Sequence, residues 1–303
     1  MTTKYGLGGP RDMEGINELK ILTWNVNFGG DALVYPAPFL ENYINDYDVI
    51  ILTEVVFNKA VEGLFKKEEY DIILSQRLNQ KYANQVVIAT KKNLNVKAVV
   101  DKLCHNESDD EDNPNFLQVQ ITAANSTYNI IGVRILSTSK AEQFQQCKRL
   151  AEYINSNKLK HNTIIAGDFN CGAIRGDSNK SYQMVKEEYE YTRDGEPNEL
   201  RFYNFHKIKE LFDNFHLKET YGEQKTWRID VYNGYINYGG AKIKNDLAIY
   251  SKNIDVTSEY SWDFVRDNQE LYENMLICNK QKKGNEIDHG FPDHAILKIT
   301  LKL

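Results

Sequence analysis

Short runs of β-branched and aromatic residues recur along most of the chain and predict that strands dominate the fold. Strands are expected at residues 19–24, 48–53, 69–75, 84–90, 116–122, 128–136, 162–167, 246–251 and 295–301. Phe116–Ile121 alternates apolar and polar residues, and Ala123–Thr127 leads into the next run, which predicts an antiparallel hairpin. Asp48–Thr53 and Thr163–Ala166 are continuously apolar at their centres, as strands covered on both faces are.

Helical spacing is clear in one segment, Lys140–Asn157, where apolar residues recur every three or four positions. Weaker helices are expected at Pro38–Asn45, Lys59–Lys67 and Phe205–Phe215. Many strands with few helices indicate an α+β fold.

The length is compatible with one domain that carries insertions. The chain has 303 residues, whereas single β-rich domains commonly reach about 200–250 residues before surface insertions are added. We expect a flexible leader at 1–18 and a single domain at 19–303. Two polar, charged segments, near 171–204 and 257–288, are expected to be insertions in that domain.

Composition predicts an ordinary soluble protein. Apolar residues make up 41% and charged residues 26% of the chain. No stretch approaches the roughly 18 apolar residues of a membrane span, so no membrane association is expected. The four cysteines are far apart and form no CxxC pair, which favours a reducing, cytoplasmic location. The net charge of −6 argues against a broad basic surface for duplex nucleic acid.

Polar side chains stand at or beside the ends of five predicted strands, and this is the most informative feature of the sequence. Each group alone fits a simple turn, because Gly, Asp and Asn are favoured in turns for backbone reasons. Together they indicate carboxylates and amides gathered at one rim. The groups are Asn25 with Asn27, Glu54, Gly167-Asp168-Phe169-Asn170, Asn245-Asp246 and Pro292-Asp293-His294.

These motifs, in this order, resemble those of the endonuclease/exonuclease/phosphatase superfamily, whose fold is deoxyribonuclease-I-like. The resemblance extends from Leu19 to Leu301. It implies two packed, mixed, mainly antiparallel β-sheets flanked by helices, in a four-layer α/β/β/α sandwich. It also implies catalysis at one sheet edge with a divalent metal.

Phosphoester hydrolysis predicts a role for each of these groups. The reaction needs neutralised phosphate oxygens, an oriented water and a balance for charge on the leaving oxygen. Oxygen ligands suit Mg²⁺, which Mn²⁺ can replace. The expected metal ligands are Glu54, Asn25 and Asp293, with Asp293 alternatively supporting another ligand. The expected catalytic residues are Asp168 and Asn170 for the water and phosphate, and His294 with Asp246, its partner in the resemblance.

Two positions depart from the family pattern. Arg134 stands where the family commonly carries His or Tyr. An arginine fork can hold a phosphate, so we predict a phosphate clamp; the alternative is a surface arginine that forms an ion pair with a neighbouring carboxylate. Asn27 is assigned to the substrate phosphate, and it lies where the family's apurinic/apyrimidinic endonucleases tend to carry Asp, which disfavours that repair activity.

Aromatic residues crowd the segment Thr226–Gly240. Trp227 and Tyr235 are candidates for stacking on unpaired bases of a substrate. A loop that fills its own small core is the alternative.

Three functions remain open on the sequence alone. The first is a Mg²⁺-dependent phosphodiesterase, a nuclease acting on DNA or RNA. The second is a phosphatase or phospholipase-type enzyme acting on inositol phosphates or phospholipids. The third is a non-catalytic binding protein that retains the fold, which the joint presence of the acidic and histidine motifs argues against.

Overall fold

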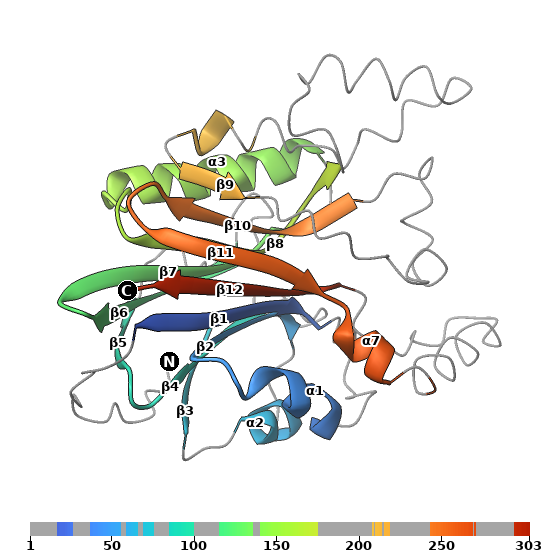
Figure 1. Cartoon of the computed structure of the whole chain (residues 1–303). Helices are drawn as coiled ribbons and strands as arrows, with labels where there is room; N and C mark the ends of the chain where they lie inside the picture. Colours follow the sequence, from blue (N-terminus) through green and yellow to red (C-terminus); the bar gives the residue numbers. More distant parts are fainter. Residues whose placement is uncertain are drawn as a thin grey trace, which may run out of the picture.

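The protein is a sandwich of two six-stranded sheets (Figure 1). The computed structural model describes residues 17–26, 37–55, 59–65, 69–75, 85–99, 115–135, 140–174, 208, 210–213, 215–218, 243–268, 270 and 294–303. The first sheet has the order β11 (Asp255–Ser261), β12 (Ile296–Lys302), β1 (Glu18–Asn25), β2 (Val49–Val55), β4 (Gln85–Lys91), β3 (Tyr70–Leu74). The second has the order β5 (Asn95–Val99), β6 (Asn115–Ala123), β7 (Ser126–Arg134), β8 (Thr163–Ile174), β10 (Ile243–Ser251), β9 (Phe215–Lys218).

Both sheets are mixed and mainly antiparallel. The parallel pairs are β1 with β2 and β7 with β8. The expected hairpin is present: β6 and β7 pair antiparallel and are joined by Ala124 and Asn125. Both turn residues have positive φ, 47° and 62°, as a tight two-residue turn between right-twisted strands requires.

Helices cover the two outer faces, which gives the four layers that the family resemblance implies. Figure 1 shows α3 (Lys140–Ser156) against the second sheet, and α1 (Ala37–Ile44) and α2 (Lys59–Leu64) below the first. The short helix α7 (Asp263–Asp267) contributes Phe264 to the same outer core of the first sheet. In the part of the chain that the structure describes, no helix could cross a membrane.

Strict alternation along the strands separates three hydrophobic cores. Ile21, Ile51 and Ile164 belong to the core between the sheets. Their neighbours Leu22 and Ile165 face the outer cores under the helices. The continuously apolar strands β2 and β8 are therefore covered on both faces, as predicted.

The strand and helix predictions are largely confirmed, and three strands were missed. β5, β9 and β11 all lie at sheet edges, and β11 with α7 occupies the beginning of the segment expected as an insertion near 257–288. The weak helix expected at Phe205–Phe215 has helical residues 208, 210 and 211, but β9 begins at Phe215. Residues 1–16 of the expected leader and most of the segment at 171–204 lie outside the described residues.

Candidate functional site

The site residues continue the inward-facing rows of the strands at one end of the sandwich. On β8, Ile164 and Ala166 face the core between the sheets, and Asp168 is the next residue on the same face. On β1, Ile21 faces that core and Asn25 lies four residues further along the same face. Buried polar groups thus replace the apolar ones where these strands end.

Unusual backbone geometry marks two of these strand ends. Glu54 has a φ of 54°, and the pairing of β2 with β4 shifts register between Leu52 and Val55. Asn170 has a φ of 49°. Such conformations cost about 1–3 kcal/mol for residues other than glycine and concentrate at functional sites, where a bulge re-aims a side chain.

Three N–H groups hold the Asp168 carboxylate. The Asn25 Nδ2 group donates to Oδ2 over 2.9 Å, and the Asn170 Nδ2 group donates to the same oxygen over 2.9 Å. The Asn170 backbone N–H donates to Oδ1 over 2.9 Å. Asn170 is fixed in turn, because its Nδ2 also donates to the Ile135 carbonyl and its own carbonyl accepts from Gln143. Asn25 from β1 and Asn170 from β8 therefore fix the orientation of the Asp168 carboxylate together.

Burial is the main influence on the ionisation of Asp168. Complete burial raises the pKa of Asp168 to about 7, with the negative charges of Asp246 and Glu54 acting in the same direction. His294 and Arg134 oppose this rise by favouring the carboxylate. A carboxylate with a pKa near 7 suits a base that operates near neutral pH.

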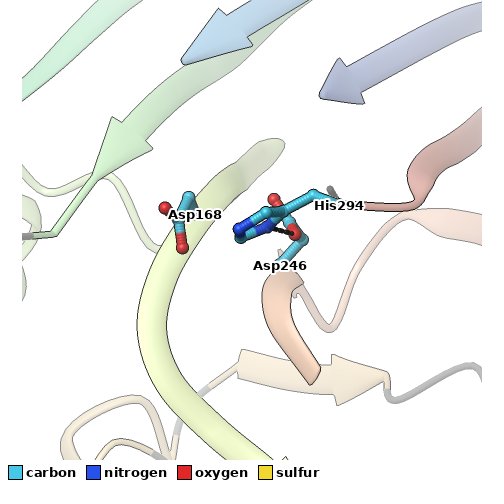
Figure 2. Close-up of side chains that lie close together, drawn as sticks. All are labelled: Asp168, Asp246 and His294. Atoms are coloured by element: carbon cyan, nitrogen blue, oxygen red, sulfur yellow. Dashed lines mark hydrogen bonds and ion pairs between the residues drawn. The ribbon is translucent and has the colours of Figure 1, made fainter. Parts of the chain in front are cut away.

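His294 is held between two carboxylates. Figure 2 shows its ring between Asp168 and Asp246, with a dashed interaction to Asp246. The Nδ1 atom lies 2.6 Å from Asp246 Oδ2, and Nε2 lies 3.4 Å from Asn25 Nδ2. If the ring donates from Nδ1 to the Asp246 carboxylate, Nε2 faces Asn25 on the other side of the ring.

Two further side chains donate hydrogen bonds to the backbone carbonyls of His294 and Asp246. Neither hydrogen bond was expected from the sequence. The Trp24 Nε1–H donates to the His294 carbonyl over 2.9 Å, and the Tyr260 hydroxyl donates to the Asp246 carbonyl. Trp24 is fully buried, with its ring centroid 4.9 Å from that of Phe264. A tryptophan before the first asparagine is visible in the sequence, but its contact with a residue 270 positions later is not.

Glu54 and Arg134 form an ion pair across the two sheets. The Arg134 Nη2 atom lies 2.6 Å from Glu54 Oε1, and the two side chains are 10% and 24% exposed. Burial raises the pKa of Glu54, but the charge and hydrogen bond of Arg134, with smaller effects of His294 and Asn25, outweigh it and lower the pKa overall. Burial alone would lower the pKa of Arg134, but the negative charges of Glu54 and Asp168 outweigh this effect, so the pKa of Arg134 is raised overall. The ion-pair alternative for Arg134 is therefore present, in a buried rather than a surface position.

The donor set is compatible with a divalent metal. One ligand atom each from Asp168, Asp246 and His294 lies within 4.8 Å of the others. The Asp246 Oδ1 atom is buried and has no hydrogen-bond partner among the described residues, so it can accept a cation. Two of these three groups are carboxylates, so oxygen ligands predominate, as Mg²⁺ and Mn²⁺ prefer.

The structure brings together seven of the eleven predicted site residues: Asn25, Glu54, Arg134, Asp168, Asn170, Asp246 and His294. The other four, Asn27, Asp293, Trp227 and Tyr235, lie outside the described residues, so their roles stay predictions.

Replacing Trp24 by Phe tests the backbone contact to His294. The ring packing is kept, but a partly buried carbonyl loses this donor, which costs roughly 1–2 kcal/mol of folding stability. We expect kcat to fall by roughly tenfold with little change in KM, because His294 is displaced rather than removed. Steady-state kinetics and thermal unfolding measure the two effects.

Trp262→Phe is the matched control, because Trp262 also packs on Phe264, with ring centroids 5.7 Å apart. It is expected to leave kcat unchanged. Equal losses of activity in the two variants would show that Trp24 acts only through packing.

Comparison with known proteins agrees with this fold. Residues 22–198 match the model of the Endonuclease/Exonuclease/phosphatase family. The chain belongs to this family of phosphoesterases. A search of curated proteins gave no match.

Three solved structures illustrate the structural similarity. Truncated TDP2 from Caenorhabditis elegans is 15% identical, with a TM-score of 0.56 over 96% of this chain and 100% of that one. The endonuclease domain of TRAS1, a telomere-specific non-LTR retrotransposon, is 13% identical, with a TM-score of 0.54 over 94% and 99%. A Staphylococcus aureus beta toxin mutant with bound magnesium ions is 16% identical, with a TM-score of 0.57 over 93% and 99%. At these identities the similarity shows the fold alone.

Proposed function

We propose that this protein is a Mg²⁺-dependent phosphodiesterase that hydrolyses nucleic acid, DNA or RNA. The observation that carries the proposal is the pairing of His294 with Asp246 beside the buried Asp168. Packing alone would demand none of these polar groups at the end of a hydrophobic sandwich, where each costs desolvation. A structure of Danio rerio TDP2 with a single-stranded DNA product and the TRAS1 endonuclease domain share the fold, which supports nucleic acid as the substrate class.

Each side chain has a defined task in this proposal. Asp168, in its ionised form, orients the attacking water and accepts its proton, while Asn170 donates to the phosphate or steadies the water. His294, held by Asp246, donates from Nε2 to the scissile phosphate or protonates the leaving oxygen. A bound Mg²⁺, held by carboxylates of the site, would neutralise phosphate oxygens and charge on the leaving oxygen.

Charge in the site favours a phosphodiester over a substrate with several phosphates. Among the described residues, Arg134 is the single permanent cation that acts on Glu54 and Asp168. An inositol polyphosphate would need several such cations. One arginine fork matches a single phosphodiester.

An activity panel tests the proposal. Purified protein with Mg²⁺, Mn²⁺ or a chelator is incubated with plasmid DNA, single-stranded DNA, RNA, a small aryl phosphodiester and small phosphomonoesters. We expect metal-dependent cleavage of at least one nucleic acid and complete loss with chelator, because a phosphate cannot approach the carboxylate cluster closely unless a cation neutralises the carboxylates. Activity on phosphomonoesters alone would assign a phosphatase, and a fully inactive panel would assign a binding protein.

A further inference from the structure

The Glu54–Arg134 ion pair joins the two sheets at the site. Glu54 is the last residue but one of β2 in the first sheet, Arg134 is the last residue of β7 in the second, and the pair is mostly buried. Gly132 allows these strands to approach closely, because a Cβ atom there would lie 2.7 Å from Ile51 Cγ2. The close approach brings the guanidinium onto the Glu54 carboxylate.

The contact uses only one side of the guanidinium. Arg134 Nη2 donates to Glu54, whereas Nε and Nη1 are buried and have no hydrogen-bond partner among the described residues. Leaving buried N–H groups unpaired costs about 1–3 kcal/mol, more where the group is charged. The Arg134 guanidinium therefore makes one hydrogen bond to Glu54, whereas arginine–carboxylate pairs frequently make two parallel ones.

Negative charge exceeds permanent positive charge around this pair. Glu54 and Asp246 both act electrostatically on Asp168, and Arg134 interacts with both Glu54 and Asp168. The guanidinium therefore lies in a region of negative potential, which attracts a divalent cation more strongly than a singly charged group.

We propose that Arg134 competes with the divalent cation for the Glu54 carboxylate, so that cation binding releases the guanidinium. This rests on the proposed Mg²⁺ dependence and on the sequence prediction that Glu54 is a metal ligand. Once released, Arg134 has its whole fork available for a substrate phosphate. Arg134 thereby weakens cation binding to the free protein while it supports substrate binding in the loaded protein.

Isothermal titration calorimetry with Mn²⁺ and no substrate tests the competition. The proteins are wild type, Arg134→Met, Glu54→Gln and the double variant. Methionine keeps much of the side-chain volume without the charge. Arg134→Met is expected to bind Mn²⁺ roughly tenfold more tightly than wild type. The coupling energies of close charge pairs correspond to changes in affinity of about tenfold or more. In the Glu54→Gln background the same substitution should have little effect.

Two outcomes overturn the competition alone. One is a wild type that binds Mn²⁺ and an Arg134→Met variant that binds it no more tightly. The other is an equal gain in the Glu54→Gln background, which would mean that Arg134 acts only through the general charge of the site. If neither protein binds Mn²⁺, the competition and the proposed metal dependence both fail.

A second measurement needs no substitution at Arg134. In wild-type protein, Mg²⁺ titration should shift the NMR resonance of the Arg134 Nε–H with the midpoint of cation binding. In Glu54→Gln the resonance should stay unchanged. An unmoved wild-type resonance at saturating Mg²⁺ contradicts release of the guanidinium.

Discussion

His294→Gln is expected to lower kcat for phosphodiester hydrolysis by roughly 10³-fold. The Nδ1 atom lies 2.6 Å from Asp246, so the imidazole is fixed and the Nε2 nitrogen is directed towards Asp168 and Asn25. Glutamine retains a polar group of similar reach but cannot transfer a proton at neutral pH. Steady-state kinetics on the best substrate of the activity panel measures the loss.

Asp246→Asn completes this test, because the two residues act as a unit. Asparagine cannot stabilise a charged imidazole, so we expect a large loss that is not additive with that of His294→Gln. His161→Gln is the control, since His161 is exposed in the turn before β8, and its kcat should equal that of wild type. Full additivity of the two site variants would show that the pair has no joint catalytic role.

Gly167→Ala is expected to destabilise the protein by roughly 3 kcal/mol or more. Gly167 has a φ of 145°, and a Cβ atom would lie 2.1 Å from the Val133 carbonyl oxygen. Since Val133 belongs to the paired strand β7, relief of the clash must separate β7 from β8 next to Asp168. The variant should therefore lose both denaturant resistance and activity.

Gly63→Ala is the matched control for this substitution. Gly63 lies exposed in α2, and a Cβ atom there would meet nothing within 4 Å. Alanine in an exposed helical position is expected to change the stability by less than about 1 kcal/mol, in the stabilising direction. If both variants unfold at the wild-type denaturant midpoint, the close approach at Gly167 has been assigned wrongly.

Hydrophobic periodicity predicted the strands that lie inside the sheets and one edge strand, β3, but it missed the other three edge strands. β11 reads Asp-Val-Thr-Ser-Glu-Tyr-Ser, with exposed polar positions along one side, so it was assigned to a polar insertion. Its identity as a strand depends on pairing with β12. β5 and β9 are short edge strands, with five and four residues. Because an edge strand buries fewer side chains, its hydrophobic pattern is weaker and harder to recognise in the sequence.

For the site, the sequence predicted residue types at strand ends but not their contacts. Asp168 and His294 were expected to meet because their motifs resemble a known family in order and position. The pairing of Glu54 with Arg134, 80 positions apart, depends on a bulge in β2 and on the spacing of two sheets. The hydrogen bonds of the supporting donors Trp24, Tyr260 and Gln143 could not be predicted from the sequence, because they arise only from tertiary packing.

The central claim is that side chains from separate strands of both sheets share one divalent cation. Anomalous diffraction from a crystal soaked in Mn²⁺ tests it most directly. The predicted result is a manganese ion at this end of the sandwich, with carboxylate oxygens of Glu54, Asp168 or Asp246 among its ligands. A crystal saturated with Mn²⁺ that holds the ion elsewhere, or none at these carboxylates, would contradict the claim.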